Sequence, residues 1–101
     1  MIIKPDEMPA HHFYKHLVWC ITPRPIAWVS SISLDGIANL APFSFFNGIG
    51  ANPPALMFSA VNRRDGSKKD TVANIESQKE FVVNIVSYAN SEAMNLSSAD
   101  F

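Results

Sequence analysis

The chain has 101 residues, of which 48% are hydrophobic and 17% are charged, and its formal net charge is -1. This composition is typical of one globular domain and excludes a disordered chain, while the near-zero charge excludes the broad basic surface of a nucleic-acid-binding protein. A chain this short buries a limited fraction of its surface, so its two tryptophans and seven phenylalanines predict that a ligand or a further subunit covers apolar surface. We therefore expect an oligomer.

Residues 1–24 have no regular pattern, because Pro5, Pro9 and Pro23 interrupt them, and we expect a short helix or an extended lead-in there. The first residues are charged where a signal peptide needs an apolar core, and no run approaches the roughly 20 apolar residues of a membrane span. The single cysteine, Cys20, is consistent with a reducing compartment. We expect a cytoplasmic protein with no membrane partner.

Two histidines in this segment, His12 and His16, lie four residues apart. A helix would place both rings on one face, as a pair of metal ligands requires. No cysteine or acid follows at ligand spacing, so ordinary, partly exposed histidines are the favoured interpretation. We predict no metal site.

A β-hairpin is predicted after Pro25. Residues 26–33 are rich in β-branched and aromatic side chains, which indicates a strand. Asp35 and Gly36 both tolerate a positive φ, so they predict a two-residue turn from which residues 37–41 return antiparallel.

The returning strand is predicted to have an open edge. Pro42 lacks an N–H, so it removes a donor from the ladder, and residues 43–46 are expected to leave regular pairing at one point. Main-chain groups between Leu40 and Ser44 would then be free for a ligand. Asn39, Ala41, Pro42 and Ser44 combine small and polar groups suited to a flat ligand with a polar rim.

The rest of the chain alternates between strands and short helices. Residues 47–54 contain two glycines and two prolines and are interpreted as a connection. Residues 55–61 and 81–86 are apolar and are predicted as strands, and residues 91–96 suit a short helix. Nothing indicates a second domain or an internal repeat.

A basic loop at residues 62–69 precedes a predicted helix that begins near Asp70. Ser67 and Asp70 have the spacing of a capping box. A helix amino terminus offers free N–H groups, and Arg63, Arg64, Lys68 and Lys69 add positive charge, so the loop is a candidate phosphate-monoester site. The Thr71 hydroxyl could add a further contact. A solvated loop that is basic only for solubility is the alternative.

No catalytic constellation is found. There is no nucleophile with a base, no telling carboxylate pair, no Walker loop and no Gly-x-Gly-x-x-Gly motif. An enzyme built on this sequence would therefore rely on a cofactor for its chemistry. Trp28, Phe43, Phe45 and Phe46 could flank a flat ring, although aromatic residues in strands more often belong to the core.

Over about residues 22–98 the sequence resembles the flavin reductase-like, flavoredoxin-type FMN-binding proteins, and the matching segments keep their order and spacing. The matching segments are residues 23–30, Asp35 with Gly36, residues 39–46, Pro53 with Pro54, residues 69–71, Asn74 with Ile75, and residues 80–84.

The resemblance implies a mainly β fold, the FMN-binding split β-barrel, which is a Greek-key antiparallel barrel with short helices. It implies a homodimer that binds FMN without a covalent bond and an oxidoreductase that passes electrons from NAD(P)H to flavin, ferric iron or a protein. An FMN-carrying electron-transfer or storage protein is the alternative. Family members continue past the position of Phe101, so we expect one domain truncated on its carboxyl-terminal side.

The resemblance also implies how the cofactor would be held. Residues 28–31 would lie along the flavin, residues 39–44 would contact the isoalloxazine and ribityl groups, and the 62–71 region would hold the phosphate. The predicted FMN-binding residues are Trp28, Ser30, Ser31, Asn39, Leu40, Ala41, Pro42, Ser44, Asn62, Arg63, Lys69, Asp70 and Thr71. No catalytic side chain is predicted.

Overall fold

The computed structural model describes residues 1–99 and combines antiparallel strands with short helices. The predicted helices near Asp70 and at residues 91–96 and the strands at residues 26–33 and 81–86 are present, and the lead-in is helical. In chain order the elements are η1 (Pro5–Glu7), α1 (Ala10–Cys20), β1 (Ala27–Ile32), β2 (Ala38–Phe43), β3 (Phe46–Ala51), β4 (Pro54–Phe58), α2 (Asp70–Gln78), β5 (Val82–Ile85), η2 (Tyr88–Asn90) and α3 (Ser91–Leu96).

The larger sheet has the strand order β2-β1-β5, and both pairings are antiparallel. The turn between β1 and β2 differs in detail from the predicted one. The Gly36 N–H donates to the Ser33 carbonyl at 3.0 Å, so Leu34 and Asp35 occupy the two central positions. Of the turn residues, only Gly36 has a positive φ, 81°, which a glycine adopts without strain.

Pro42 costs β2 no ladder hydrogen bond, contrary to the sequence prediction. The Ser33 N–H donates to the Ile37 carbonyl, and the register pairs Ala41 with Val29 and Phe43 with Ala27. Since hydrogen-bonded positions alternate along an antiparallel pair, the main-chain groups of Leu40 and Pro42 face away from β1. The missing N–H of Pro42 therefore lies on the free edge of β2, and pairing continues to Phe43.

The second sheet corrects the interpretation of residues 47–54 as a simple connection. β3 occupies most of this segment and pairs with β4 in an antiparallel ladder, with a register shift between Gly48 and Gly50. Glycine weakens a strand in isolation but is common where a strand bulges. The glycines therefore mark an irregular strand, and pairing with β4 supplies the hydrogen bonds that its own sequence does not predict.

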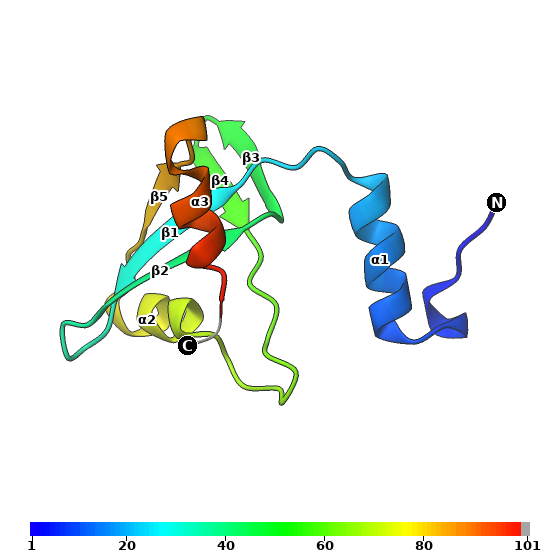
Figure 1. Ribbon diagram of the computed structural model, residues 1–101, viewed down its shortest axis with the longest axis horizontal. Helices are drawn as coiled ribbons and strands as arrows, with labels where there is room; N and C mark the ends of the chain where they lie inside the picture. The colour runs from blue at the N-terminus through cyan, green and yellow to red at the C-terminus, as the bar shows by residue number, and fades with distance from the viewer. Residues whose placement is uncertain (100–101) are drawn as a thin grey trace.

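Helix α2 lies on one face of the larger sheet, and α3 contacts β2 (Figure 1). The predicted capping box is wrong: α2 has Lys69 at its N-cap without a side-chain cap, and the Ser67 hydroxyl donates to Asp65 Oδ1 at 2.6 Å. The helix ends where Lys79 adopts the left-handed conformation, with φ 62°.

Helix α1 stands apart from the two sheets in Figure 1 and has no buried residue. Arg24 anchors its carboxyl-terminal end. One guanidinium nitrogen donates to the carbonyls of Val18 and Ile21, at 2.6 and 2.8 Å, and Nε donates to Ser44 Oγ at 3.3 Å. These bonds satisfy carbonyls that the helix end leaves free and tie α1 to the link between β2 and β3.

The core is small. Ala27, Val29 and Phe43 are its buried apolar residues, and Phe46 and Phe58 pack against them from the second sheet. The chain exposes 7843 Å², whereas a compact monomer of its mass would expose about 5,700 Å². Roughly 2,000 Å² of surface is thus available beyond what a closed domain of this size leaves in water.

Candidate functional site

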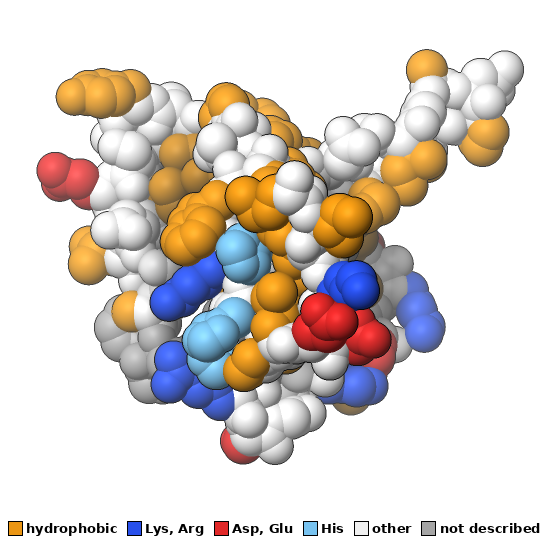
Figure 2. All heavy atoms as spheres, turned by 90° about the vertical axis from the view of Figure 1, so that its right-hand side faces the viewer, with side chains coloured by type: hydrophobic (Ala, Val, Ile, Leu, Met, Phe, Trp, Pro, Cys, Tyr) orange, Lys and Arg blue, Asp and Glu red, His pale blue; other side chains and the backbone are white. Residues whose placement is uncertain are grey.

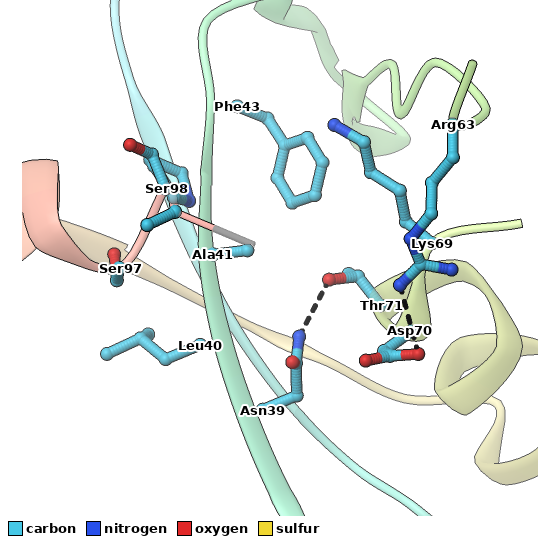
Figure 3. Close-up of a pocket in the computed structure, with 12 residues that line it drawn as sticks. Asn39, Leu40, Ala41, Phe43, Arg63, Lys69, Asp70, Thr71, Ser97 and Ser98 are labelled. Atoms are coloured by element: carbon cyan, nitrogen blue, oxygen red, sulfur yellow. Dashed lines mark hydrogen bonds and ion pairs between the residues drawn. The ribbon is translucent and has the colours of Figure 1, made fainter. Parts of the chain in front are cut away.

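A cavity of about 430 Å³ runs along the free edge of β2, which is within the size range of small-molecule sites (Figure 3). It lies between the sheet, the amino-terminal turn of α2 and the segment that follows α3. The lining residues are Asn39, Leu40, Ala41, Pro42, Phe43, Arg63, Lys69, Asp70, Thr71, Ser97, Ser98 and Ala99.

The cavity straddles the strand edge. Successive side chains of β2 point to opposite faces, so Asn39 points toward α2 and Leu40 toward Ser97 (Figure 3). Between them, the main-chain N–H and carbonyl of Leu40 face away from β1. A flat ligand placed here would meet main-chain donors and acceptors at its rim and side chains on either side.

The amino terminus of α2 forms the polar end of the cavity. The first helical hydrogen bonds are donated by the N–H groups of Val72 and Ala73 to the Lys69 carbonyl, at 3.0 and 3.2 Å. Within residues 1–99, the N–H groups of Asp70 and Thr71 have no main-chain acceptor. Free N–H groups and the positive end of the helix dipole favour an anion here.

The charges around this end are mostly neutralised within the chain. Arg63 Nη2 lies 3.2 Å from Asp70 Oδ1, and both carboxylate oxygens of Glu76 lie 2.8 Å from Lys68 Nζ. Among the described residues Lys69 forms no ion pair, and its Nζ lies 5.4 Å from the centroid of the Phe43 ring. Of the two cations that line the cavity, Arg63 and Lys69, Lys69 is therefore the one more available to a ligand.

An internal hydrogen-bond pair shapes the basic loop. The Ser67 hydroxyl and then the Ser67 N–H, both donating to Asp65 Oδ1, lower the pKa of Asp65 below its ordinary value. A lowered carboxyl pKa stabilises the loop at pH values above the ordinary pKa, and this contribution is lost as the pH falls through the lowered pKa.

Thr71 and Asn39 hold the helix against the strand beneath the polar end. Asn39 Nδ2 donates to Thr71 Oγ1 at 2.9 Å, and Thr71 is only 1% exposed. The hydroxyl therefore already has a protein partner. Its burial indicates that Thr71 fixes the position of the helix end, and the predicted phosphate contact of its side chain stays a prediction.

Ser31 lies under α2 and does not line this cavity. Its hydroxyl accepts a hydrogen bond of 3.1 Å from Asn74 Nδ2, and both residues are buried. One helical turn further on, Gln78 Nε2 donates to the Ser33 carbonyl at 3.1 Å. Together with Thr71, these contacts attach one face of α2 to β1 and β2.

Replacing Asn74 by alanine is expected to lower the free energy of unfolding by about 1–3 kcal/mol, because the buried Ser31 hydroxyl would lose its partner. Urea unfolding followed by circular dichroism measures the change. Gln78→Ala is the matched control: its bond is only partly buried, and we expect a loss of about 1 kcal/mol or less. Equal losses in the two variants would refute this account of the helix contact.

Trp28 and Ser30 lie on the opposite face of the sheet. Trp28 Nε1 donates to Ser97 Oγ at 2.9 Å, and Asn84 Nδ2 donates to Ser30 Oγ at 3.2 Å. Both residues line a separate depression with Leu40, and neither lines the cavity at the strand edge. Trp28 is connected to that cavity by its hydrogen bond to Ser97, which does line it.

Ser44 and Asn62 line a neighbouring cavity with Lys69. The structure thus brings eight of the predicted residues into the first cavity and leaves the other five outside it. The eight are Asn39, Leu40, Ala41, Pro42, Arg63, Lys69, Asp70 and Thr71, and the five are Trp28, Ser30, Ser31, Ser44 and Asn62.

Sequence reasoning missed three lining residues: Ser97, Ser98 and Ala99. Phe43 also lines the cavity; it belongs to the 39–44 segment that was expected to contact the ring, but it was not among the thirteen residues named for FMN binding. No local signal marks the serines, because only the return of the chain past α3 brings them to β2.

No group of three or more His, Cys, Asp or Glu side chains in residues 1–99 is arranged to hold a metal ion. None of the helices described has the length and apolar character needed to cross a bilayer.

Antiparallel strands with short helices and a cavity along a free strand edge place the chain in the split β-barrel class, although the barrel is not closed within residues 1–99. The sequence model of a protein family described as "Flavin reductase like domain" matches residues 20–101 of the chain. The chain belongs to the flavin reductase-like family, which confirms the predicted fold class and the resemblance.

Similar proteins cover the whole of this chain, but it spans about half the length of the curated relatives it matches. An uncharacterized protein of Aquifex aeolicus is 52% identical over 95 residues, which are 94% of this chain and 48% of the relative. Nitrilotriacetate monooxygenase component B from Bacillus cereus matches with a TM-score of 0.91 and 39% identity, over 99% of this chain and 50% of that one. Pseudomonas fluorescens 2-nitrobenzoate 2-nitroreductase NbaA matches with a TM-score of 0.85 and 35% identity, over 100% of this chain and 48% of that one.

Proposed function

We propose that the chain is the part of an oxidoreductase that binds FMN, with the flavin held without a covalent bond in the cavity at the free edge of β2. One observation carries the proposal: the free edge of β2 and an uncapped helix amino terminus with an available lysine line a single cavity of about 430 Å³. A ring with a phosphate tail needs both of these features, at opposite ends of one site.

The residues at the two ends fit the two parts of FMN. The N–H groups of Asp70 and Thr71 and the ammonium of Lys69 would hold the phosphate. The Leu40 main chain would meet the polar rim of the ring, where a donated N–H also stabilises the negative charge that reduction adds. Bound flavin supplies the electron-carrying chemistry for which this chain has no side-chain constellation.

Arg63 would complete the phosphate end. Its guanidinium already donates to the Lys68 carbonyl at 2.6 Å and pairs with Asp70, so it is held beside the helix terminus. A guanidinium has five N–H donors, and these two contacts leave others for a phosphate oxygen.

NAD(P)H is the proposed electron donor, and flavin, ferric iron or a protein is the proposed acceptor. The names of the two solved relatives, a monooxygenase component and a nitroreductase, support a redox role without fixing either reactant. The second candidate function is an FMN-carrying electron-transfer or storage protein. It is favoured by the absence of any side-chain acid or base placed for catalysis in the sequence.

The functional assembly is proposed to be a homodimer. The support is the exposed surface of 7843 Å², about 2,000 Å² more than a compact monomer of this mass leaves in water. A second subunit and the region that the longer relatives have in addition are both candidates to cover it. A cytoplasmic location stays a prediction.

The test is an FMN titration followed by stopped-flow mixing of the flavin-loaded protein with NADH and with NADPH. The proposal predicts saturable binding of FMN and bleaching of its visible absorbance by one of the nicotinamides. Binding without bleaching by either nicotinamide would favour the carrier function. A folded protein that does not bind FMN would contradict both functions.

A further inference from the structure

A second cavity, of about 290 Å³, opens beside the first. It lies between α1 and the link from β2 to β3, and it contains two residues that the sequence placed in the cofactor site, Ser44 and Asn62. Pro42, Phe43 and Lys69 line both cavities. The two spaces are therefore separated only by the end of β2 and one lysine.

Two aromatic rings that are not part of the core form a wall of this cavity. Tyr14 of α1 meets Phe45 edge to face, with ring centroids 5.9 Å apart and an angle of 62° between the planes. Tyr14 is 48% exposed, so its ring has free surface. A half-exposed aromatic pair of this kind offers an edge and a face to a third flat ring.

Arg24 fixes this aromatic wall. Its guanidinium carbon lies 5.8 Å from the centroid of the Phe45 ring, and its N–H groups hold both the end of α1 and the hydroxyl of Ser44. Figure 2 shows the side of the molecule on which α1 lies, with hydrophobic side chains around its histidines and Lys or Arg side chains beside them. The same arginine therefore holds α1 to the rest of the chain and contacts the Phe45 ring of the aromatic wall.

The polar groups of the cavity favour an anion. Lys69 is the one charged side chain among the residues that line it, and no carboxylate does so. Asn62, Ser44 and Ser59 add an amide and two hydroxyls, and within residues 1–99 the Asn62 side chain has no hydrogen-bond partner. An ammonium has three N–H donors, so Lys69, which lines both cavities, can donate to an anion in each of them.

We propose that the second cavity binds the other reactant, a flat aromatic ring that carries an anionic group, next to the flavin. The ring would lie against Tyr14 and Phe45, and its anionic group would meet Lys69 and Asn62. This inference rests on the proposed function, because the shared lining of Pro42, Phe43 and Lys69 places the second ligand beside the first.

The test is an NMR titration of the ¹⁵N-labelled chain with 2-naphthoate, with and without saturating FMN. The expected result is saturable binding in both conditions, with shifts of the amide signals of Tyr14, Ser44 and Asn62. Tyr14→Ala is expected to weaken binding by roughly 3- to 10-fold, the range of one aromatic contact. Since α1 buries no residue, this change leaves the core intact.

The matched control is Tyr88→Ala, because Tyr88 is 98% exposed and lines neither cavity. It should leave the affinity for 2-naphthoate unchanged. The neutral analogue 2-naphthalenemethanol should bind the unmodified chain more weakly than 2-naphthoate. Equal affinity for the two compounds would refute the anionic preference.

The outcomes separate this inference from the proposed function. Displacement of FMN by 2-naphthoate, or equal affinities in Tyr14→Ala and the unmodified chain, would overturn the second site while FMN binding stands. Binding of 2-naphthoate that depends on Tyr14, in a chain that does not bind FMN, would support the second site and refute the proposed cofactor.

Discussion

Replacing Phe43 by alanine is expected to lower the free energy of unfolding by about 3–5 kcal/mol. Phe43 is 5% exposed, and its ring packs against that of Phe58 with centroids 4.9 Å apart. It is the largest of the three buried apolar side chains in the described residues, so its truncation leaves a cavity in the core. A typical domain is stable by only about 5–15 kcal/mol, and we expect the variant to be largely unfolded at 37 °C.

Phe81→Ala is the matched control for this substitution. Its ring also meets Phe58, with centroids 5.1 Å apart, but Phe81 is 38% exposed. The same truncation should therefore cost roughly 1–2 kcal/mol, because less apolar surface returns to water. Urea unfolding monitored by circular dichroism compares the two variants. A loss in Phe43→Ala no greater than that in Phe81→Ala would show that the core does not lie where the structure puts it.

Replacing Lys69 by methionine is expected to weaken FMN binding by about 1–3 kcal/mol, which is roughly 5- to 150-fold in the dissociation constant. Methionine keeps most of the length of the side chain and removes the charge. Lys69 lines the cavity beside the free N–H groups of α2 and forms no ion pair within residues 1–99. Its ammonium is thus the available partner of a phosphate.

Lys68→Met provides the control at the neighbouring position. Lys68 Nζ is bonded to both oxygens of Glu76 at 2.8 Å, and the residue lines neither cavity. Titration of flavin fluorescence should give unchanged FMN affinity for Lys68→Met and reduced affinity for Lys69→Met. Equal weakening would mean that the general charge of the loop attracts the phosphate, and an unchanged affinity in both would move the phosphate site elsewhere.

The strands and helices with a strong local pattern could be predicted from the sequence. β-branched residues bounded by Pro25 and by the Asp35–Gly36 turn gave β1 and β2, and helical spacing gave α2. β3 was missed because Gly48 and Gly50 carry no strand signal, and the hydrogen bonds that stabilise it come from β4, which follows after a two-residue connection. The sequence of one strand does not by itself show which other strand it pairs with.

The candidate site divides in the same way. The polar end was predictable because Lys69, Asp70 and Thr71 are consecutive and begin a helix. The predicted capping box is absent because the Ser67 hydroxyl bonds to Asp65 and does not cap α2. Such a local hydrogen bond competes with capping, and the Ser67–Asp70 spacing does not show which of the two forms. Ser97 and Ser98 reach the cavity only through the path of the chain after α3, and Ser31 faces α2 because of the register of β1.

The central claim is that one cavity holds a flat ring along β2 and a phosphate at the start of α2. Comparing the affinities of the chain for FMN and for riboflavin, which lacks the phosphate, tests it most directly. The account predicts that calorimetric titration gives at least about 10-fold tighter binding of FMN, and that Lys69→Met removes most of this preference. Equal affinities for FMN and riboflavin in the unmodified chain would contradict it.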